Sequence, residues 1–192
     1  MNYPEKLVNE EQLEELLSRP SEQVIELFKK LEGDVIFLGI AGKIGPSIAR
    51  MAKRASEEAG VSRRIIGVSR FRNEQEKKAI GRFGIETISG DLLNPDFIKS
   101  LPQVKNVIFL AGMKFGSEDN LSLTWAMNTY VPALVAEHFK NSVIVAFSTG
   151  CVYPLVDIKS GGSLESDQPQ AIGEYAQSCL RSEERRVGKE CR

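Results

Sequence analysis

Residues 35–45 read Val-Ile-Phe-Leu-Gly-Ile-Ala-Gly-Lys-Ile-Gly, an apolar run that passes directly into three evenly spaced glycines. The four residues Val35–Leu38 have the length and character of a buried strand, and a helical pattern begins directly after the glycines. Glycines permit a tight turn, a close approach of backbone to a ligand, and tight contact between helix and strand. The segment therefore predicts a strand–turn–helix unit with Gly39, Gly42 and Gly45 in the turn.

The predicted turn has the chemistry of a phosphate site. The N-terminus of a helix offers backbone amides and a partial positive charge to an anion. Because the glycines follow a strand and open a helix, we expect this loop, including Lys43 and Ile44, to bind the pyrophosphate of a nucleotide. The alternative is a plain glycine-rich turn that binds nothing.

Beyond this unit, short apolar runs alternate with helical stretches. Strands are expected at Val35–Leu38, Ile65–Val68, Glu86–Ser89, Val107–Leu110 and Val143–Phe147. Helices are expected at Pro46–Ala59, Asn73–Phe83, Asn94–Leu101 and Leu121–Phe139, the last of which Pro132 should kink or split. Alternation of this kind, with strands that are apolar throughout, predicts an α/β fold. The expected architecture is a Rossmann-type doubly wound parallel sheet with helices on both faces.

The two ends of the chain differ from this central pattern. Residues 1–32 predict a helical extension, broken at Pro20, with Ser21 as N-cap of its second helix, and residues 33–180 form the predicted Rossmann domain. Residues 181–192 read RSEERRVGKECR, which resembles a translated sequencing adapter. We therefore expect a non-native tail that packs against nothing, the alternative being a solvated charged tail. On the first interpretation, the domain is incomplete beyond Leu180.

Composition excludes several classes of function. The formal net charge of −1 gives no electrostatic reason to expect nucleic acid or a membrane surface as a partner. Neither a membrane-length apolar run nor a signal peptide is evident, so a cytoplasmic protein is expected. Three cysteines and one histidine show no metal-ligand spacing, and no metal site is expected.

Four further segments indicate one family. They are Gly90-Asp91-Leu92, Phe109-Leu110-Ala111-Gly112, Asn128, and Phe147-Ser148-Thr149-Gly150-Cys151-Val152-Tyr153-Pro154. Together with the GxxGxxG loop, they make residues 35–180 resemble the extended short-chain dehydrogenases/reductases, the NAD-dependent epimerase/dehydratase family. The resemblance implies an NAD(P)-binding oxidoreductase that acts on a small molecule, such as a nucleotide sugar. It also implies that a C-terminal substrate-binding region is missing from this chain.

The resemblance assigns roles to particular residues. Asp91 and Leu92 match the family's positions near the adenine, and Ala111 and Gly112 match the segment that passes beside the cofactor. Thr149 matches the catalytic serine or threonine. Two of these residues also have a structural interpretation, Asp91 as a capping or turn residue and Thr149 as a helix cap.

The end of the second predicted strand bears on the choice of cofactor. An NAD enzyme usually places an acid there to bind the ribose 2′-hydroxyl. This chain has Ser69, Arg70 and Arg72 in that segment, without an acid. Because arginine forms paired hydrogen bonds with phosphate, we expect NADP to be favoured over NAD. Alternatively, both arginines are solvated, or Arg70 stacks on the adenine of either cofactor.

The catalytic signature departs from the family pattern. Members carry Tyr-x-x-x-Lys, in which the lysine's charge favours the phenolate, whereas this chain has Tyr175 followed four residues later by Cys179. An unassisted phenol has a pKa of about 10, and cysteine supplies no cation. The resemblance gives Thr149 and Tyr175 as catalytic positions. Lys114 and Glu174 are candidate substitutes for the missing lysine, and the sequence does not place them near Tyr175.

The missing lysine leaves two functions open. The chain is expected to belong to an NAD(P)-dependent epimerase, dehydratase or reductase, or alternatively to a catalytically degenerate NAD(P)-binding sensor or scaffold. On the second interpretation, Tyr175 is an ordinary half-buried tyrosine and Cys179 a small core residue. Family members often pair through helices of the type predicted at residues 121–139, so a homodimer is also expected.

Overall fold

The computed structural model describes residues 4–116 and 118–187, and the side chains of residues 184–187 are left out of the description. No helix in these ranges is both long enough and apolar enough to cross a membrane. The chain forms two compact units, described separately here. The first, the sheet unit, holds the chain up to Asp91, Pro102–Leu110 and Asn141–Val145. The second, the helical unit, holds Leu92–Leu101, Ala111–Lys140 and the chain from Ala146 onward.

The predicted sheet is confirmed, with strand order β3-β2-β1-β4-β5. Its strands are β1 (Val35–Leu38), β2 (Ile65–Ser69), β3 (Glu86–Ser89), β4 (Asn106–Phe109) and β5 (Val143–Ala146). Strand β1 pairs in parallel with both β2 and β4, and β2 pairs in parallel with β3. This order is that of a Rossmann-type α/β fold, in which the chain leaves β1 at the centre of the sheet.

The centre of the sheet is buried because its strands are apolar on both faces. All four residues of β1 are buried, and Phe37 packs in a core cluster with Ile65 and Ile40. Helix α3 (Gly45–Glu58) packs against this cluster through small residues, of which Ala49 and Ala55 are fully buried. Strands β3 and β5 have exposed positions, whereas β1 is buried along its whole length.

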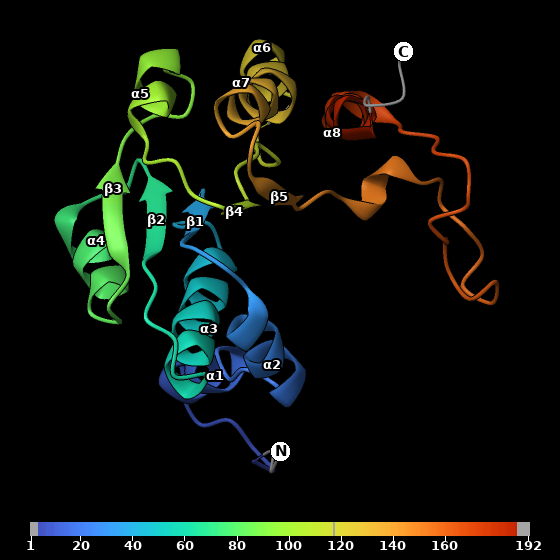
Figure 1. The fold of residues 1–192 in the computed structure, drawn as a ribbon. Helices are drawn as coiled ribbons and strands as arrows, with labels where there is room; N and C mark the ends of the chain where they lie inside the picture. Colours follow the sequence, from blue (N-terminus) through green and yellow to red (C-terminus); the bar gives the residue numbers. More distant parts are fainter. Residues whose placement is uncertain (1–3, 117, 188–192) are drawn as a thin grey trace. The chain divides into compact units, whose positions relative to one another are not determined.

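The N-terminal extension forms two helices that contact α3 (Figure 1). These are α1 (Glu10–Leu17) and α2 (Glu22–Lys30), and Ser21 caps α2 as predicted by accepting a hydrogen bond from the backbone of Val24. Arg63 holds the end of α2: its Nη2 donates to the carbonyls of Phe28 and Leu31 at 2.7 and 2.8 Å.

Two short helices follow β2 and β3. Helix α4 (Glu74–Gly81) begins directly after Asn73, which caps it and was the predicted start of this helix, and it contacts β3 (Figure 1). Helix α5 (Pro95–Ser100) begins at Asn94, whose side chain accepts hydrogen bonds from the backbone of Asp96 and Phe97. An asparagine cap followed by Pro95 in the first turn is a local signal, and it correctly predicted the start of α5.

The predicted break at Pro132 is confirmed in the helical unit. Residues 121–138 divide into α6 (Leu121–Trp125), a π-helical turn η1 (Ala126–Tyr130) and α7 (Val131–His138). Pro132 lies in the first turn of α7, directly after the π turn. The wider π turn accommodates the change of hydrogen-bonding pattern just before it.

The last described helix changes the interpretation of the tail. Helix α8 (Gly173–Val187) continues through the beginning of the predicted non-native segment because arginine and glutamate are good helix formers. Ser182 is only 2% exposed, and Ser148 donates a hydrogen bond to Glu183. The expectation that residues 181–192 pack against nothing is therefore wrong for these two residues, and residues 188–192 lie outside the described part.

Gly45 gives a test of how α3 meets the end of β1. A Cβ at Gly45 would lie 2.1 Å from the carbonyl oxygen of Ile40, a distance that requires backbone movement. We expect Gly45→Ala to lower the free energy of unfolding by about 1–3 kcal/mol, the usual cost of overpacking. Urea unfolding followed by circular dichroism measures this change.

Gly81→Ala is the matched control. Gly81 is helical, and a Cβ there meets no heavy atom within 4 Å. The control should leave stability unchanged or raise it by up to about 1 kcal/mol, since alanine is the better helix former. Equal unfolding midpoints for Gly45→Ala and the unsubstituted chain would contradict the packing argument.

Candidate functional site

The glycine loop is a closed turn at the carboxyl end of β1. Gly39 has a φ of +93°, which glycine adopts without strain, and its amide donates to the carbonyl of Val68 at 2.9 Å. The amide of Gly42 donates to the carbonyl of Gly39 at 3.1 Å, and the amide of Gly45 to that of Gly42 at 3.2 Å. The loop thus carries the chain from the central strand directly into α3.

The N-terminus of α3 has the properties of an anion site. Its N-cap, Ile44, supplies no side-chain hydrogen bond, and Gly42, Lys43 and Ile44 are exposed. A Cβ at Gly42 would lie 3.3 Å from the carbonyl oxygen of Gly39, a close contact that favours glycine there. The bare backbone of this loop fits a pyrophosphate, which needs amide donors and close approach.

Gly67 is a loop-supporting residue that sequence reasoning missed. A Cβ at Gly67 in β2 would lie 2.4 Å from Cδ1 of Ile40, so this glycine makes room for the side chain that anchors the loop. A lone glycine inside an apolar strand was the available signal, because such a residue often marks a close approach. Gly67 therefore acts on the loop through Ile40.

The two arginines after β2 each pair with a carboxylate. One carboxylate follows β3, and the other lies on α4. Arg70 pairs with Asp91 at 3.8 Å, and Arg72 pairs with Glu76 at 3.2 Å. The arginine side chains are 70% and 85% exposed, so these pairs contribute little to stability. Ser69 accepts a backbone hydrogen bond from Gly90 at 3.1 Å. The predicted acid-free segment thus has two acids beside it.

Leu92, Ala111 and Gly112 lie in the helical unit. The side chain of Leu92 is 6% exposed and belongs to the core, so only its backbone is available to a cofactor. A Cβ at Gly112 would lie 3.3 Å from Oδ1 of Asn128, which makes glycine the fitting residue at this position.

Asn128 joins three segments of the helical unit. Its Oδ1 accepts a hydrogen bond from the amide of Met113 at 2.7 Å, and its Nδ2 donates to the carbonyl of Met113 at 3.0 Å. Nδ2 also donates to the hydroxyl of Ser178 on α8 at 3.0 Å, and Ser178 donates to the carbonyl of Tyr175. The π turn that carries Asn128 therefore fixes both the segment after β4 and the helix of Tyr175.

Thr149 and Tyr175 come together in the helical unit. Burial raises the pKa of Tyr175, a hydrogen bond with Thr149 opposes that rise, and the neighbouring Cys179 and Cys151 raise the pKa further. The net direction is upward from 10.0, which favours the neutral phenol. Thr149 also caps the short 3₁₀ turn η2 (Gly150–Val152), accepting a hydrogen bond from the amide of Cys151 at 3.2 Å.

Neither suggested substitute for lysine, Lys114 or Glu174, is among the groups that shift the pKa of Tyr175. Glu174 accepts a hydrogen bond from Nε1 of Trp125 at 2.5 Å. Lys114 is exposed, with its Nζ 6.0 Å from the ring centre of Phe115. In the described ranges, no group of three or more metal-ligating side chains is present.

Comparison with solved structures identifies the fold. MoeE5 in complex with UDP-glucose and NAD matches with a TM-score of 0.62 and 22% identity over 78% of this chain and 46% of that one. UDP-glucuronic acid 4-epimerase from Bacillus cereus, in complex with UDP-glucuronic acid and NAD, matches with 0.63 and 21% over 78% and 50%. ADP-L-glycero-D-manno-heptose-6-epimerase from Helicobacter pylori matches with 0.68 and 15% over 88% and 53%.

These similarities concern the fold, and the chain spans about half the length of the structures it matches. No family model matches the chain, and no curated protein matches it.

Cys179 gives a test of the Tyr175 environment. Replacing Cys179 by lysine removes a neighbour that raises the pKa of Tyr175 and introduces a cation that lowers it. We expect Cys179→Lys to lower this pKa by about one to three units, the usual effect of a close opposite charge. Alkaline titration of tyrosine absorbance, with the Tyr175→Phe variant subtracted, measures the shift.

Cys179→Ala serves as a second variant that introduces no charge, and it should lower the pKa by a smaller amount. The sign extends to stability: a raised folded pKa contributes stability below the unfolded pKa of about 10 that is lost as pH rises through the folded value. The native chain should therefore lose thermal stability above pH 10 more steeply than Tyr175→Phe. An unchanged titration in both Cys179 variants would contradict this account.

Proposed function

We propose that this chain is the nucleotide-binding portion of an NAD(P)-dependent epimerase/dehydratase-like oxidoreductase that acts on a nucleotide sugar. The observation that carries the proposal is the exposed glycine loop between β1 and α3, with an N-terminus that has no side-chain cap. The similarity in fold to structures that contain NAD and UDP-sugars supports it.

The cofactor would be held mainly by backbone. The amides of Lys43 and Ile44 would bind the pyrophosphate at the start of α3, with Gly42 allowing its close approach. Asp91, two residues after β3, would contact the adenosine part, and the backbone of Ala111 and Gly112 would pass beside the cofactor. A bound nicotinamide cofactor would supply hydride transfer to or from a substrate carbon.

Tyr175 and Thr149 would act at the substrate oxygen. Tyr175 would move a proton to or from this oxygen, and the hydroxyl of Thr149 would hydrogen-bond to it. Their mutual contact supports this assignment.

A second function, a cofactor-binding sensor or scaffold without catalysis, is favoured by a specific observation. The surroundings of Tyr175 raise its pKa, and Cys179 occupies the position where the resemblance implies a cation. A phenol with a raised pKa is almost entirely neutral near pH 7, so very little phenolate is present to accept a proton.

We further propose that NADP is preferred to NAD. Arg70 and Arg72 are exposed cations whose pairs with Asp91 and Glu76 cost little to break. A 2′-phosphate would replace these carboxylates with a doubly charged, multidentate acceptor.

Calorimetric titration of the 192-residue chain with each cofactor tests both proposals. We expect NADP to bind more tightly than NAD, and Arg72→Gln to weaken NADP binding by on the order of tenfold while leaving NAD binding nearly unchanged. Tighter binding of NAD would reject the NADP preference and leave the glycine-loop assignment intact.

Gly42→Val separates the loop from the arginines. A branched side chain there would occupy the space of the pyrophosphate, and binding of both cofactors should be lost. Lys78→Gln is the control, because this exposed residue lies on α4 outside the loop. Retained affinity in Gly42→Val would remove the loop from the cofactor site, and with it the observation that carries the proposed function.

A further inference from the structure

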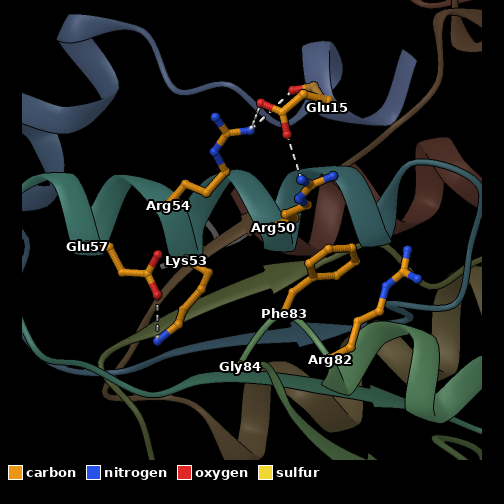
Figure 2. A pocket seen from close by; sticks show the side chains of 8 residues that line it. All are labelled: Glu15, Arg50, Lys53, Arg54, Glu57, Arg82, Phe83 and Gly84. Atoms are coloured by element: carbon orange, nitrogen blue, oxygen red, sulfur yellow. Dashed lines mark hydrogen bonds and ion pairs between the residues drawn. The ribbon is translucent and has the colours of Figure 1, made fainter. Parts of the chain in front are cut away.

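A polar pocket in the sheet unit lies away from the glycine loop. It has a volume of about 560 Å³ and lies between the face of α3 and the turn that precedes β3 (Figure 2). Gly84, in that turn, comes before the amino end of β3, whereas the glycine loop follows the carboxyl end of β1. Because the strands are parallel, the turn lies at the amino ends of the strands and the loop lies at their carboxyl ends.

The pocket contains more cations than carboxylates. Glu15 on α1 is shared between Arg50 at 2.6 Å and Arg54 at 3.0 Å, and Lys53 pairs with Glu57 at 3.3 Å (Figure 2). Burial alone would raise the pKa of Glu15, but the charges and hydrogen bonds of the arginines hold it below its ordinary value. Three cations on α3 are thus balanced by two carboxylates.

Arg82 adds a fourth cation without a carboxylate. In the part of the chain that the structure describes, no salt bridge joins Arg82 to an acid. Its guanidinium carbon lies 4.7 Å from the ring centre of Phe83, and that of Arg50 lies 4.4 Å from the same ring. Figure 2 shows Phe83 between these two arginines. The ring therefore packs against two cations. With Lys53 and Arg54, the pocket has four cations and two carboxylates, an excess of two positive charges.

Gly84 leaves space for the remaining cation. Its φ is +73°, and a Cβ at this position would lie 2.9 Å from Cε and 3.5 Å from Nζ of Lys53. The absence of a side chain at Gly84 lets the end of the Lys53 side chain lie against the turn. Lys53 and the two arginines all line this one pocket, from α3 and from the turn.

We propose that this pocket binds a phosphoryl dianion, with Arg50, Lys53 and Arg82 as its ligands. Two negative charges match the excess of two positive charges in the pocket. Guanidinium groups bind phosphate through paired hydrogen bonds, and an ammonium group adds a compact charge. The ligand is either free phosphate or the phosphate group of a small phosphomonoester. This site is independent of the proposed cofactor function.

Nuclear magnetic resonance of the ¹⁵N-labelled 192-residue chain tests the proposal residue by residue. Inorganic phosphate and glycerol 3-phosphate are titrated separately, and the tighter of the two identifies the source. We expect saturable shifts of the Arg82–Gly84 amides for at least one probe. Binding of the ester should weaken as the pH falls below about 6, where a phosphomonoester takes up its second proton.

Charge-removing variants define the ligands. Arg82→Gln and Lys53→Gln should each weaken binding by on the order of tenfold, the effect of losing one charge-assisted hydrogen bond. Lys78→Gln removes the same charge from α4 outside the pocket and should change the affinity less than about twofold. A retained pattern of well-dispersed amide signals verifies that each variant is folded.

Three results would overturn the proposal. The first is a linear, non-saturating shift with both probes, which indicates weak surface association. The second is equal weakening in Lys78→Gln and Arg82→Gln, which indicates a general charge effect. The third is a response confined to the amides of residues 39–45, which places the anion at the glycine loop.

Discussion

The contact between the first turn of α3 and the carbonyl oxygen of Ile40 is the constraint on which the sheet unit depends. No side chain fits at Gly45, and Gly67 must also lack one so that Ile40 can occupy its buried position. With both glycines present, α3 packs closely through Ala49 and Ala55 on the centre of the sheet. The same close approach brings the N-terminus of α3 to the end of β1.

In the helical unit, a single buried amide has the corresponding role. Asn128 satisfies the backbone of Met113 and the hydroxyl of Ser178, groups that would be costly to bury without partners. The π turn presents Asn128 to both segments, and Ser178 in turn bonds to the carbonyl of Tyr175. The position of the proposed acid/base residue therefore depends on hydrogen bonds made within one turn of it on α8.

The arginines of this chain differ in what holds them. Arg70 and Arg72 are extended into solvent beside carboxylates, whereas Arg50 and Arg82 are held against the ring of Phe83. A cation with an exposed acidic partner exchanges that partner readily for a phosphate. Arg50 also pairs with Glu15, whereas Arg82 has the ring contact and, among the described residues, no salt bridge to an acid. The two groups thus offer two distinct ways of binding an anion on one sheet.

The sequence by itself determined the local elements, because their signals are local. Apolar runs predicted the strands, and Asn73 and Asn94 predicted the starts of α4 and α5. The position of Pro132 predicted the interruption between α6 and α7. The glycine spacing after β1 predicted the loop, and the alternation of apolar runs with helical stretches predicted the parallel sheet. Each of these features depends on residues within a few positions of one another.

Only the tertiary structure revealed which distant groups meet. The pairing of Arg70 with Asp91, the bond between Asn128 and Ser178, and the contact of Thr149 with Tyr175 join residues from different elements. The expectation of an unpacked tail failed for the same reason, since α8 buries Ser182 through contacts that no local pattern encodes. The pocket around Phe83 likewise arises where α1, α3 and the turn before β3 converge. Such contacts are set by the packing of whole helices and strands, which bring together side chains that are far apart along the chain.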